Sequence, residues 1–181
     1  IGFDSVDVFT KAMTIPEDEI QLIESTCAEN NLPIVSVVVV AAGLIDFNDP
    51  VRDFHLERAK KFVDLAARFK ANNLLLVLGE YIWQREVIPP EVQWQWGVEN
   101  TQAIGDYAAE SGIEIALELE PFRLSLLNNV KEMVRFIDDC DRPNVKVNID
   151  VSHLVLADVS PAEVASLKGK ATHVHISDCD G

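Results

Sequence analysis

Acidic and imidazole side chains gather at the ends of three apolar segments of the sequence. The first segment ends in Leu-Glu-Leu-Glu-Pro, the second in Asn-Ile-Asp-Val-Ser-His, and the third in His-Val-His-Ile-Ser-Asp. Divalent cations such as Mg, Mn, Co and Zn take carboxylate oxygens and imidazole nitrogens as ligands. A metal site is therefore the chemistry that these residue types favour if the chain folds them together. The side chains concerned are Glu118, Glu120, Asp150, His153, His173, His175 and Asp178.

Each of these residues also has a plainer explanation when it is taken alone. A carboxylate at a strand end can cap the following helix, and a histidine in a strand can be hydrogen-bonded in the core. The three segments follow one another along the chain, and each supplies such a residue at the same end. Because capping alone does not explain that coincidence, a shared site is favoured.

The spacing within each segment indicates which residues would be the ligands. Side chains two apart in a strand point to the same face, so Glu118 goes with Glu120, and His173 goes with His175. In each pair the later residue lies nearer the carboxyl end of its strand. We therefore expect Glu120 and His175, together with Asp150, to hold the metal ion. Glu118 and His173 are the alternates, placed beneath them.

Repeated β-α units would bring these strand ends together. Apolar runs rich in branched residues alternate with longer amphipathic segments, which is typical of an α/β protein with a parallel sheet. Proline residues mark four helix starts, at Pro16, Pro50, Pro90 and Pro161. The strands are expected at residues 6–9, 33–41, 73–79, 113–120, 144–150 and 171–178.

The pattern alone fits either an open doubly wound sheet or most of an eight-stranded (β/α) barrel. No Gly-rich phosphate loop follows any of the expected strands, which disfavours the nucleotide-binding form of the open sheet. The barrel is therefore favoured. No linker rich in Pro, Gly or Ser divides the chain, so we expect residues 1–181 to form a single domain.

Composition excludes several classes of partner. The chain has 181 residues, 48% of them hydrophobic, and its 30 acidic and 15 basic residues give a formal charge of −15. Such a field repels phosphate backbones and anionic membrane surfaces, so neither nucleic acid nor a membrane is an expected partner. The three cysteines lie far apart and are too few for a disulfide framework, and we expect a cytoplasmic protein with reduced thiols.

The motifs resemble those of the xylose isomerase-like TIM barrel superfamily of sugar phosphate isomerases and epimerases. The resemblance is carried by residues 119–121, 148–153 and 173–178, and residues 2–9 are similar to the second strand of that family's barrel. It implies the metal ligands Glu120, Asp150 and His175, with His153 near the substrate. It also implies a fourth ligand, usually a glutamate, at the end of an eighth strand.

The resemblance further implies that this sequence is part of a longer chain. If residues 6–9 are strand two and residues 171–178 are strand seven, strands one and eight lie outside the sequence. The chain also begins with Ile1 rather than Met. We therefore expect a fragment that covers about strands 2 to 7 and that has, by itself, at best a three-ligand site.

The expected function is that of a metal-dependent isomerase or epimerase of a small sugar, a sugar phosphate or a related hydroxy-carbonyl compound. A divalent ion (Mn, Mg, Co or Zn) would stabilise the enediolate formed when a proton leaves the carbon beside the carbonyl. Glu120 is the expected base, and His153 would steer a substrate hydroxyl. Glu80, Trp83 and Asp178 are further candidates for substrate binding.

Other functions remain open at this point. A polyol dehydratase of the inosose type would begin with the same proton abstraction, so the sequence does not separate it from an epimerase. A non-catalytic binding module could keep the barrel without the chemistry. An endonuclease of this fold is disfavoured by the charge of −15 and by a count of only four histidines. The sequence leaves the oligomeric state open, a homo-oligomer included.

Overall fold

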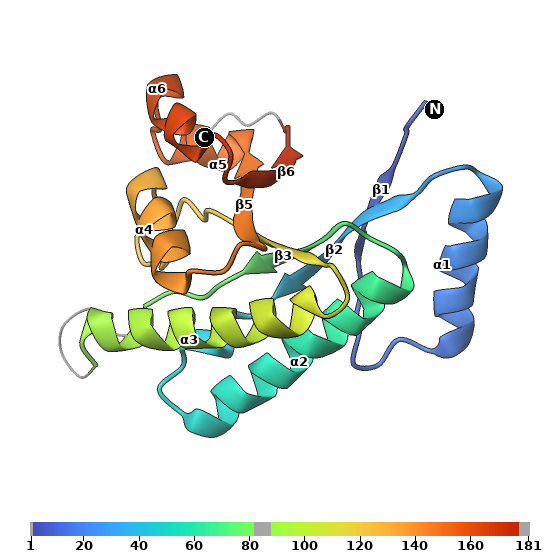
Figure 1. Ribbon diagram of the computed structural model, residues 1–181, viewed down its shortest axis with the longest axis horizontal. Coiled ribbons are helices and arrows are strands. Elements are labelled where there is room, and N and C mark those ends of the chain that lie inside the picture. Colours follow the sequence, from blue (N-terminus) through green and yellow to red (C-terminus); the bar gives the residue numbers. More distant parts are fainter. Residues whose placement is uncertain (1, 82–87, 178–181) are drawn as a thin grey trace.

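The computed structural model describes residues 2–81 and 88–177 of the chain. Within these residues the centre is a six-stranded sheet whose strands lie in chain order, with every neighbouring pair parallel. Figure 1 shows this sheet with its helices. The strands are β1 (Val6–Phe9), β2 (Ile34–Val40), β3 (Asn73–Val77), β4 (Glu114–Leu117), β5 (Val145–Asp150) and β6 (Ala171–His175).

All six predicted strands form, and the α/β prediction is confirmed. The largest difference is at β4, which was expected to continue to Glu120 and ends at Leu117. The Glu118 N–H still bonds the Leu76 carbonyl at 3.1 Å, but the Glu120 N–H bonds the Leu127 carbonyl at 3.0 Å. The backbone therefore leaves the sheet between these two glutamates.

Helices follow the strands at the predicted starts. Ser160 caps α6 in a capping box with Glu163, and Asn129 caps α4 by accepting a hydrogen bond from the Glu132 N–H at 2.9 Å. His153 lies in the short helix α5, directly behind β5. The α-helices are α1 (Glu17–Glu29), α2 (Asp49–Arg68), α3 (Pro90–Ala109), α4 (Val130–Cys140), α5 (Val151–Leu156) and α6 (Pro161–Val164), and the 3-10 helices are η1 (Ala42–Ile45) and η2 (Ala165–Leu167).

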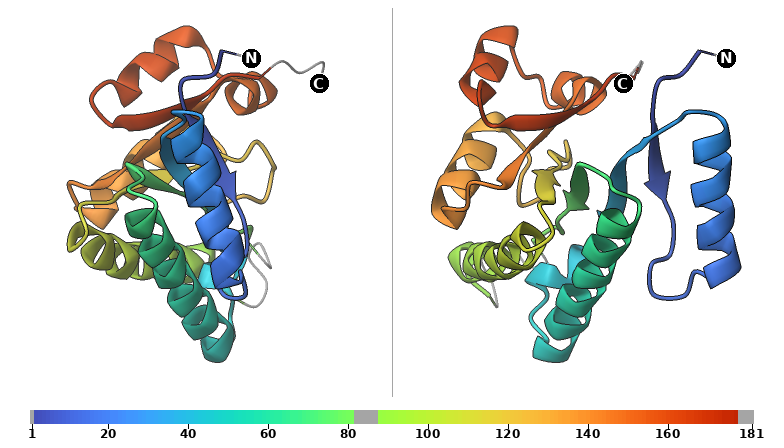
Figure 2. Two further views of the ribbon diagram at one scale, coloured as in Figure 1. Left: turned by 90° about the vertical axis from the view of Figure 1, so that its right-hand side faces the viewer. Right: turned by 45° about the vertical axis from the view of Figure 1, so that its right-hand side comes forward.

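The two faces of the sheet differ in chemistry. One face packs against α2, α3 and α4 in a continuous apolar core, in which Phe62 of α2 and Phe136 of α4 are fully buried. The sheet curls into part of a barrel with these helices outside it (Figure 2). The face inside the curl carries polar side chains from several strands: Asp7, Ser36, Asn73, Glu114, Lys146, Asn148, Asp150, His173 and His175.

The helices in the described ranges include none that is long and apolar enough to cross a membrane.

Candidate functional site

The carboxyl ends of β4 and β5 bring three candidate residues together. One ligand atom from each of Glu118, Asp150 and His153 lies within 4.8 Å of the others. Glu118 directly follows β4, Asp150 is the last residue of β5, and His153 projects from α5. The carboxyl ends of barrel strands are also where the active sites of (β/α) barrels lie.

Glu118 is the most deeply buried member of this group, with 4% of its surface exposed. Its Oε2 accepts a hydrogen bond from Asn148 Nδ2 at 2.6 Å, and its Oε1 lies 3.3 Å from His153 Nδ1. Burial disfavours the charged carboxylate and raises the pKa of Glu118 to about 7. The group can therefore both hold and release a proton near neutral pH.

Asp150 has a structural role as well as a place in the site. Its Oδ1 caps α5 by accepting bonds from the Ser152 N–H at 2.9 Å, the Ser152 hydroxyl at 2.6 Å and the His153 N–H at 3.2 Å. Its Oδ2 lies 3.7 Å from His175 Nδ1. Burial pushes the pKa of Asp150 up, but the hydrogen bonds from Ser152 and His153 outweigh it, and the pKa is lowered. Asp150 is therefore an anion that caps a helix with one oxygen and faces His175 with the other.

The ring of His153 is held by a backbone carbonyl. Its Nδ1 lies 2.7 Å from the Leu119 oxygen, so Nδ1 carries the proton and donates it. In the neutral ring this leaves Nε2 as an acceptor. Burial lowers the pKa of His153, but nearby Glu118 and the Leu119 carbonyl raise it by more, and the net shift is upward.

A second group joins the two edge strands of the sheet. Asp7 of β1 places its Oδ2 at 3.1 Å from His173 Nε2 and 3.0 Å from His175 Nε2, both on β6. The two imidazole rings meet edge to face, with centroids 4.9 Å apart. The prediction that His173 and His175 share a face is confirmed. His175 links the two groups, because its other nitrogen, Nδ1, lies 3.7 Å from Asp150 Oδ2.

The structure places Glu120 differently from the sequence-based expectation. Among the described residues, two groups are close enough to hold a metal ion: one of Glu118, Asp150 and His153, and one of Asp7, His173 and His175. Neither contains Glu120. The backbone turns away after β4, and Glu120 is half-buried at the rim of the site. Burial raises the pKa of Glu120, and His153, Asp150 and Glu80 are close enough to influence it. The expectation of Glu120 as a ligand assumed a strand that continues to Glu120, whereas β4 ends at Leu117.

Of the further substrate-binding candidates, Glu80 is the one within the described residues. Glu80 is exposed, follows β3, and its backbone pairs with Ser125 in an isolated antiparallel bridge. Its carboxylate acts on the pKa of Glu120, which places the two side chains near one another. Trp83 and Asp178 lie outside the described residues.

Two residues of the site were missed in the sequence. Asp7 lies between Val6 and Val8 in β1, and Asn148 lies two residues before Asp150 in β5, on the same face. A polar side chain in a strand that is otherwise apolar was the available signal at both positions. The partners of Asp7 were not readable, because they lie 166 and 168 residues away in the sequence.

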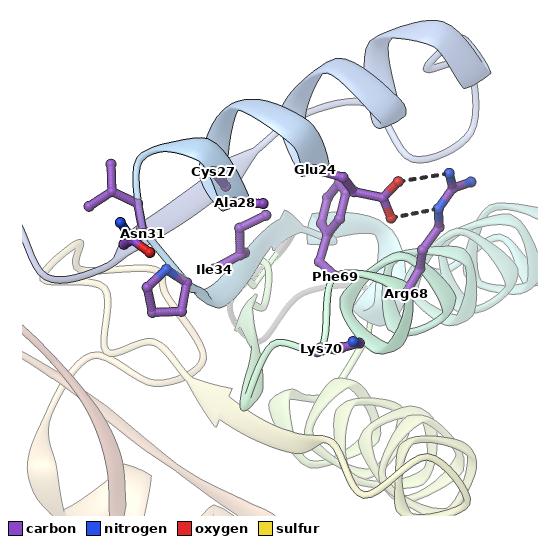
Figure 3. A pocket seen from close by; sticks show the side chains of 10 residues that line it. Glu24, Cys27, Ala28, Asn31, Ile34, Arg68, Phe69 and Lys70 are labelled. Atoms are coloured by element: carbon purple, nitrogen blue, oxygen red, sulfur yellow. Dashed lines mark hydrogen bonds and ion pairs between the residues drawn. The ribbon is translucent and has the colours of Figure 1, made fainter.

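A cavity of about 680 Å³ lies at a different place, between α1, the start of β2 and the end of α2. Figure 3 shows its lining, with Arg68 of α2 paired to Glu24 of α1. Ile34, which also lines it, is the first residue of β2. The cavity is therefore at the amino ends of the strands, opposite the candidate site.

The donor set fits a divalent metal ion. Two buried oxygens, Glu118 Oε1 and Asn148 Oδ1, have no hydrogen-bond partner in the described part of the chain. Leaving buried oxygens without a partner is costly unless another group compensates them. Carboxylate oxygens beside an imidazole nitrogen suit Mg, Mn, Co and Zn alike.

Comparisons with known proteins agree with this architecture. The family model described as "Xylose isomerase-like TIM barrel" matches residues 1–181. D-psicose 3-epimerase of Ruminiclostridium cellulolyticum is 24% identical over 188 residues, an alignment that covers 99% of this chain. The chain spans 64% of that protein's length, which is less than two thirds. Fructoselysine 3-epimerase of Escherichia coli O157:H7 is 22% identical, in an alignment that covers 100% of this chain and 69% of the length of that protein.

Solved structures share the fold over nearly the whole chain. A 3-keto-D-glucoside 4-epimerase from E. coli superposes with a TM-score of 0.84 at 17% identity, over 98% of this chain and 70% of its own. A xylose isomerase-like TIM barrel protein from Mycobacterium smegmatis, in complex with magnesium, superposes with a TM-score of 0.78 at 22% identity. The superposition covers 98% of this chain and 62% of that protein's chain. The curled sheet, its polar inner face and the match over all 181 residues lead to one conclusion: this chain belongs to the xylose isomerase-like TIM barrel family.

Proposed function

We propose that this chain carries the main part of the active site of a divalent-metal-dependent epimerase or isomerase of a small sugar or a related hydroxy-carbonyl compound. The observation that carries the proposal is Glu118, a buried carboxyl group with a pKa of about 7 beside Asp150 at the strand ends. The similar proteins named above as sugar epimerases support it.

In this proposal Glu118, Asp150 and His175 hold the metal ion. The similar M. smegmatis protein in complex with magnesium supports a divalent ion, and the donor types leave Mn, Co and Zn open as well. When bound, the ion would polarise a substrate carbonyl and stabilise the negative charge that develops on its oxygen. Glu120, the ligand that the sequence first favoured, is the alternate.

Glu118 is also the proposed base. A general base works best when its pKa is near the operating pH, and in the metal-free chain burial raises the pKa of Glu118 toward that range. Asn148 holds Oε2 at 2.6 Å and so fixes the carboxylate that, in this proposal, takes a proton from the carbon beside the substrate carbonyl. An epimer would form if a second acid gave a proton to the opposite face of that carbon, and an isomer would form if Glu118 gave its proton to the neighbouring carbon.

His153 and the rim residues are proposed to bind substrate hydroxyl groups. The Leu119 carbonyl holds the Nδ1 proton of His153, which leaves Nε2 to accept a hydrogen bond from a hydroxyl group. Glu80 and Glu120 offer carboxylates at the rim for the same purpose. Roles for Trp83 and Asp178 stay predictions.

Several features of the whole protein also stay predictions. They are the single domain, the missing strands one and eight with a fourth ligand, the cytoplasmic location, the absence of a nucleic-acid partner and the homo-oligomer.

Solvent-deuterium exchange tests the proposed chemistry. The full chain, loaded with Mn²⁺, is incubated in deuterated water with a panel of ketoses and ketose phosphates, and deuterium at the carbon beside the carbonyl is measured by NMR. We expect deuterium incorporation together with an epimer or an isomer, and at least a 100-fold slower exchange in Glu118→Gln. Loss of water from the substrate would instead identify a dehydratase. Metal binding without exchange on any substrate would favour a binding module.

A further inference from the structure

Asp7 lies outside the proposed ligand set, yet it contacts the proposed ligand His175. It comes from β1, and the sheet order places β1 at the opposite edge from β6, which carries His175. The contact therefore depends on the curl of the sheet (Figure 2). Asp7 Oδ2 lies 3.0 Å from His175 Nε2. A carboxylate oxygen accepts hydrogen bonds, so this contact favours a proton on His175 Nε2, although His173 Nε2 also lies 3.2 Å from that nitrogen.

The other nitrogen of His175 has the complementary neighbour. Asn148 Nδ2 lies 3.3 Å from His175 Nδ1, and the same amide nitrogen donates to Glu118 Oε2 at 2.6 Å. An amide nitrogen is a donor, so Nδ1 is the nitrogen without a proton. The two contacts thus favour the same tautomer, with the proton on Nε2 and the lone pair on Nδ1. Nδ1 is the nitrogen that faces Asp150 Oδ2, at 3.7 Å.

His173 is held in the same way and supports Asp7 from one side. Its Nε2 lies 3.1 Å from Asp7 Oδ2, and its Nδ1 lies 3.4 Å from Asn73 Nδ2. Asn73 in turn accepts a hydrogen bond from the Ser36 hydroxyl at 2.7 Å. A chain of hydrogen bonds therefore runs from β2 through β3 and β6 to β1, and it fixes the position of the Asp7 carboxylate.

We infer that Asp7 is a positioning residue, which orients His175 and holds it in the tautomer whose Nδ1 lone pair is directed toward the metal. This inference rests on the proposed function, since it takes His175 as a ligand. A histidine ligand with a carboxylate on its second nitrogen is fixed in orientation and is more basic, and loss of such a partner costs about 10- to 100-fold in metal affinity.

The test combines a metal-free measurement with a metal titration on the full chain. The tautomer of His175 is determined in metal-free protein from its ring ¹⁵N shifts, and Mn²⁺ affinity is determined by calorimetry. The variants are Asp7→Ala, the conservative Asp7→Asn and the control Asp4→Ala, whose residue is exposed three positions earlier in the chain. Thermal unfolding of each metal-free variant shows that it folds.

We expect Asp7→Ala to mix the tautomers of His175 and to weaken Mn²⁺ binding about 10- to 100-fold. Asp7→Asn keeps an acceptor oxygen and should recover part of the affinity, while Asp4→Ala should match the wild type. The inference is overturned if Asp7→Ala keeps both the tautomer and the affinity of the wild type. It is also overturned if the wild type binds a second Mn²⁺ that only the Asp7 variants lose, because Asp7 would then be a ligand. If the wild type binds no Mn²⁺, the proposed function fails, and an unchanged tautomer in Asp7→Ala would still overturn the role of Asp7.

Discussion

Glu118 differs from the other carboxylates of the site in its burial. Its pKa of about 7 in the folded protein compares with an ordinary value of 4.5. At a pH between these two pKa values, Glu118 has lost its proton in the unfolded chain and keeps it in the folded protein. Because the folded state binds more protons there, the free energy of unfolding must fall as the pH rises through this interval.

The size of this fall is a testable property of Glu118. In metal-free protein we expect a loss of about 3 kcal/mol between about pH 4.5 and about pH 7. The Glu118→Gln variant has no group to titrate at this position and should lack that part of the pH dependence. Urea unfolding of both proteins in the presence of a chelator measures the difference. If the free energy of unfolding changed with pH in the same way in both proteins, burial would not shift the pKa of Glu118.

The two roles of Asp150 can be separated by two substitutions. Asparagine is as good a helix N-cap as aspartate, so Asp150→Asn should keep α5 capped while removing the charge that a metal ion requires. Asp150→Ala should lose the cap as well, at a cost of about 1 kcal/mol. We therefore expect both variants to lose metal affinity and only Asp150→Ala to lose stability. Chemical unfolding and calorimetry measure the two effects, and full metal affinity in Asp150→Asn would exclude Asp150 as a ligand.

For single residues, the sequence indicated which residue types would form the site, and it indicated less well which residues they would contact. Asp150, His153 and His175 were expected to come together, and the structure places His153 and His175 near Asp150. The choice between Glu118 and Glu120 depended on where β4 ends, and that depends on the Glu120 N–H bonding Leu127 instead of a neighbouring strand. Such a long-range backbone contact leaves no local signal in the sequence.

Among the elements, α2 offers a matched test of the core. Phe62 is fully buried against the outer face of the sheet, while Phe54, two turns earlier on the same helix, is 55% exposed. Phe62→Ala should lower the free energy of unfolding by about 3 to 5 kcal/mol, because it opens a cavity. Phe54→Ala should change it by about 0.5 kcal/mol or less. Urea unfolding compares them, and equal losses would contradict the packing of α2 described here.

The elements were largely predictable because their signals are local. Alternating apolar and amphipathic segments indicated all six strands, and proline or capping residues indicated where α1, α2, α3 and α6 begin. The ends of the strands were predicted less accurately. For example, the expected range 171–178 continues past His175, where β6 ends. The short helix α5 was not expected, because the metal-ligand interpretation of its cap, Asp150, was favoured over the capping one.

At the scale of the whole molecule, the curl of the sheet determines which residues meet. The parallel order of the strands could be expected from the β-α pattern, and the family match over residues 1–181 agrees with it. The contact of Asp7 with His173 and His175 could not be expected from the sequence, because it joins the first and last strands of the sheet. It follows from the summed twist and curl of six strands, which no single segment encodes.

We propose that Glu118, and not Glu120, holds the metal ion together with Asp150 and His175. Calorimetric titration of the full chain with Mn²⁺, for the wild type and for the matched variants Glu118→Gln and Glu120→Gln, distinguishes the two glutamates. We expect about one ion per chain in the wild type, similar affinity in Glu120→Gln, and affinity at least about tenfold lower in Glu118→Gln. The opposite ranking of the two variants, or no binding by the wild type, would contradict this proposal.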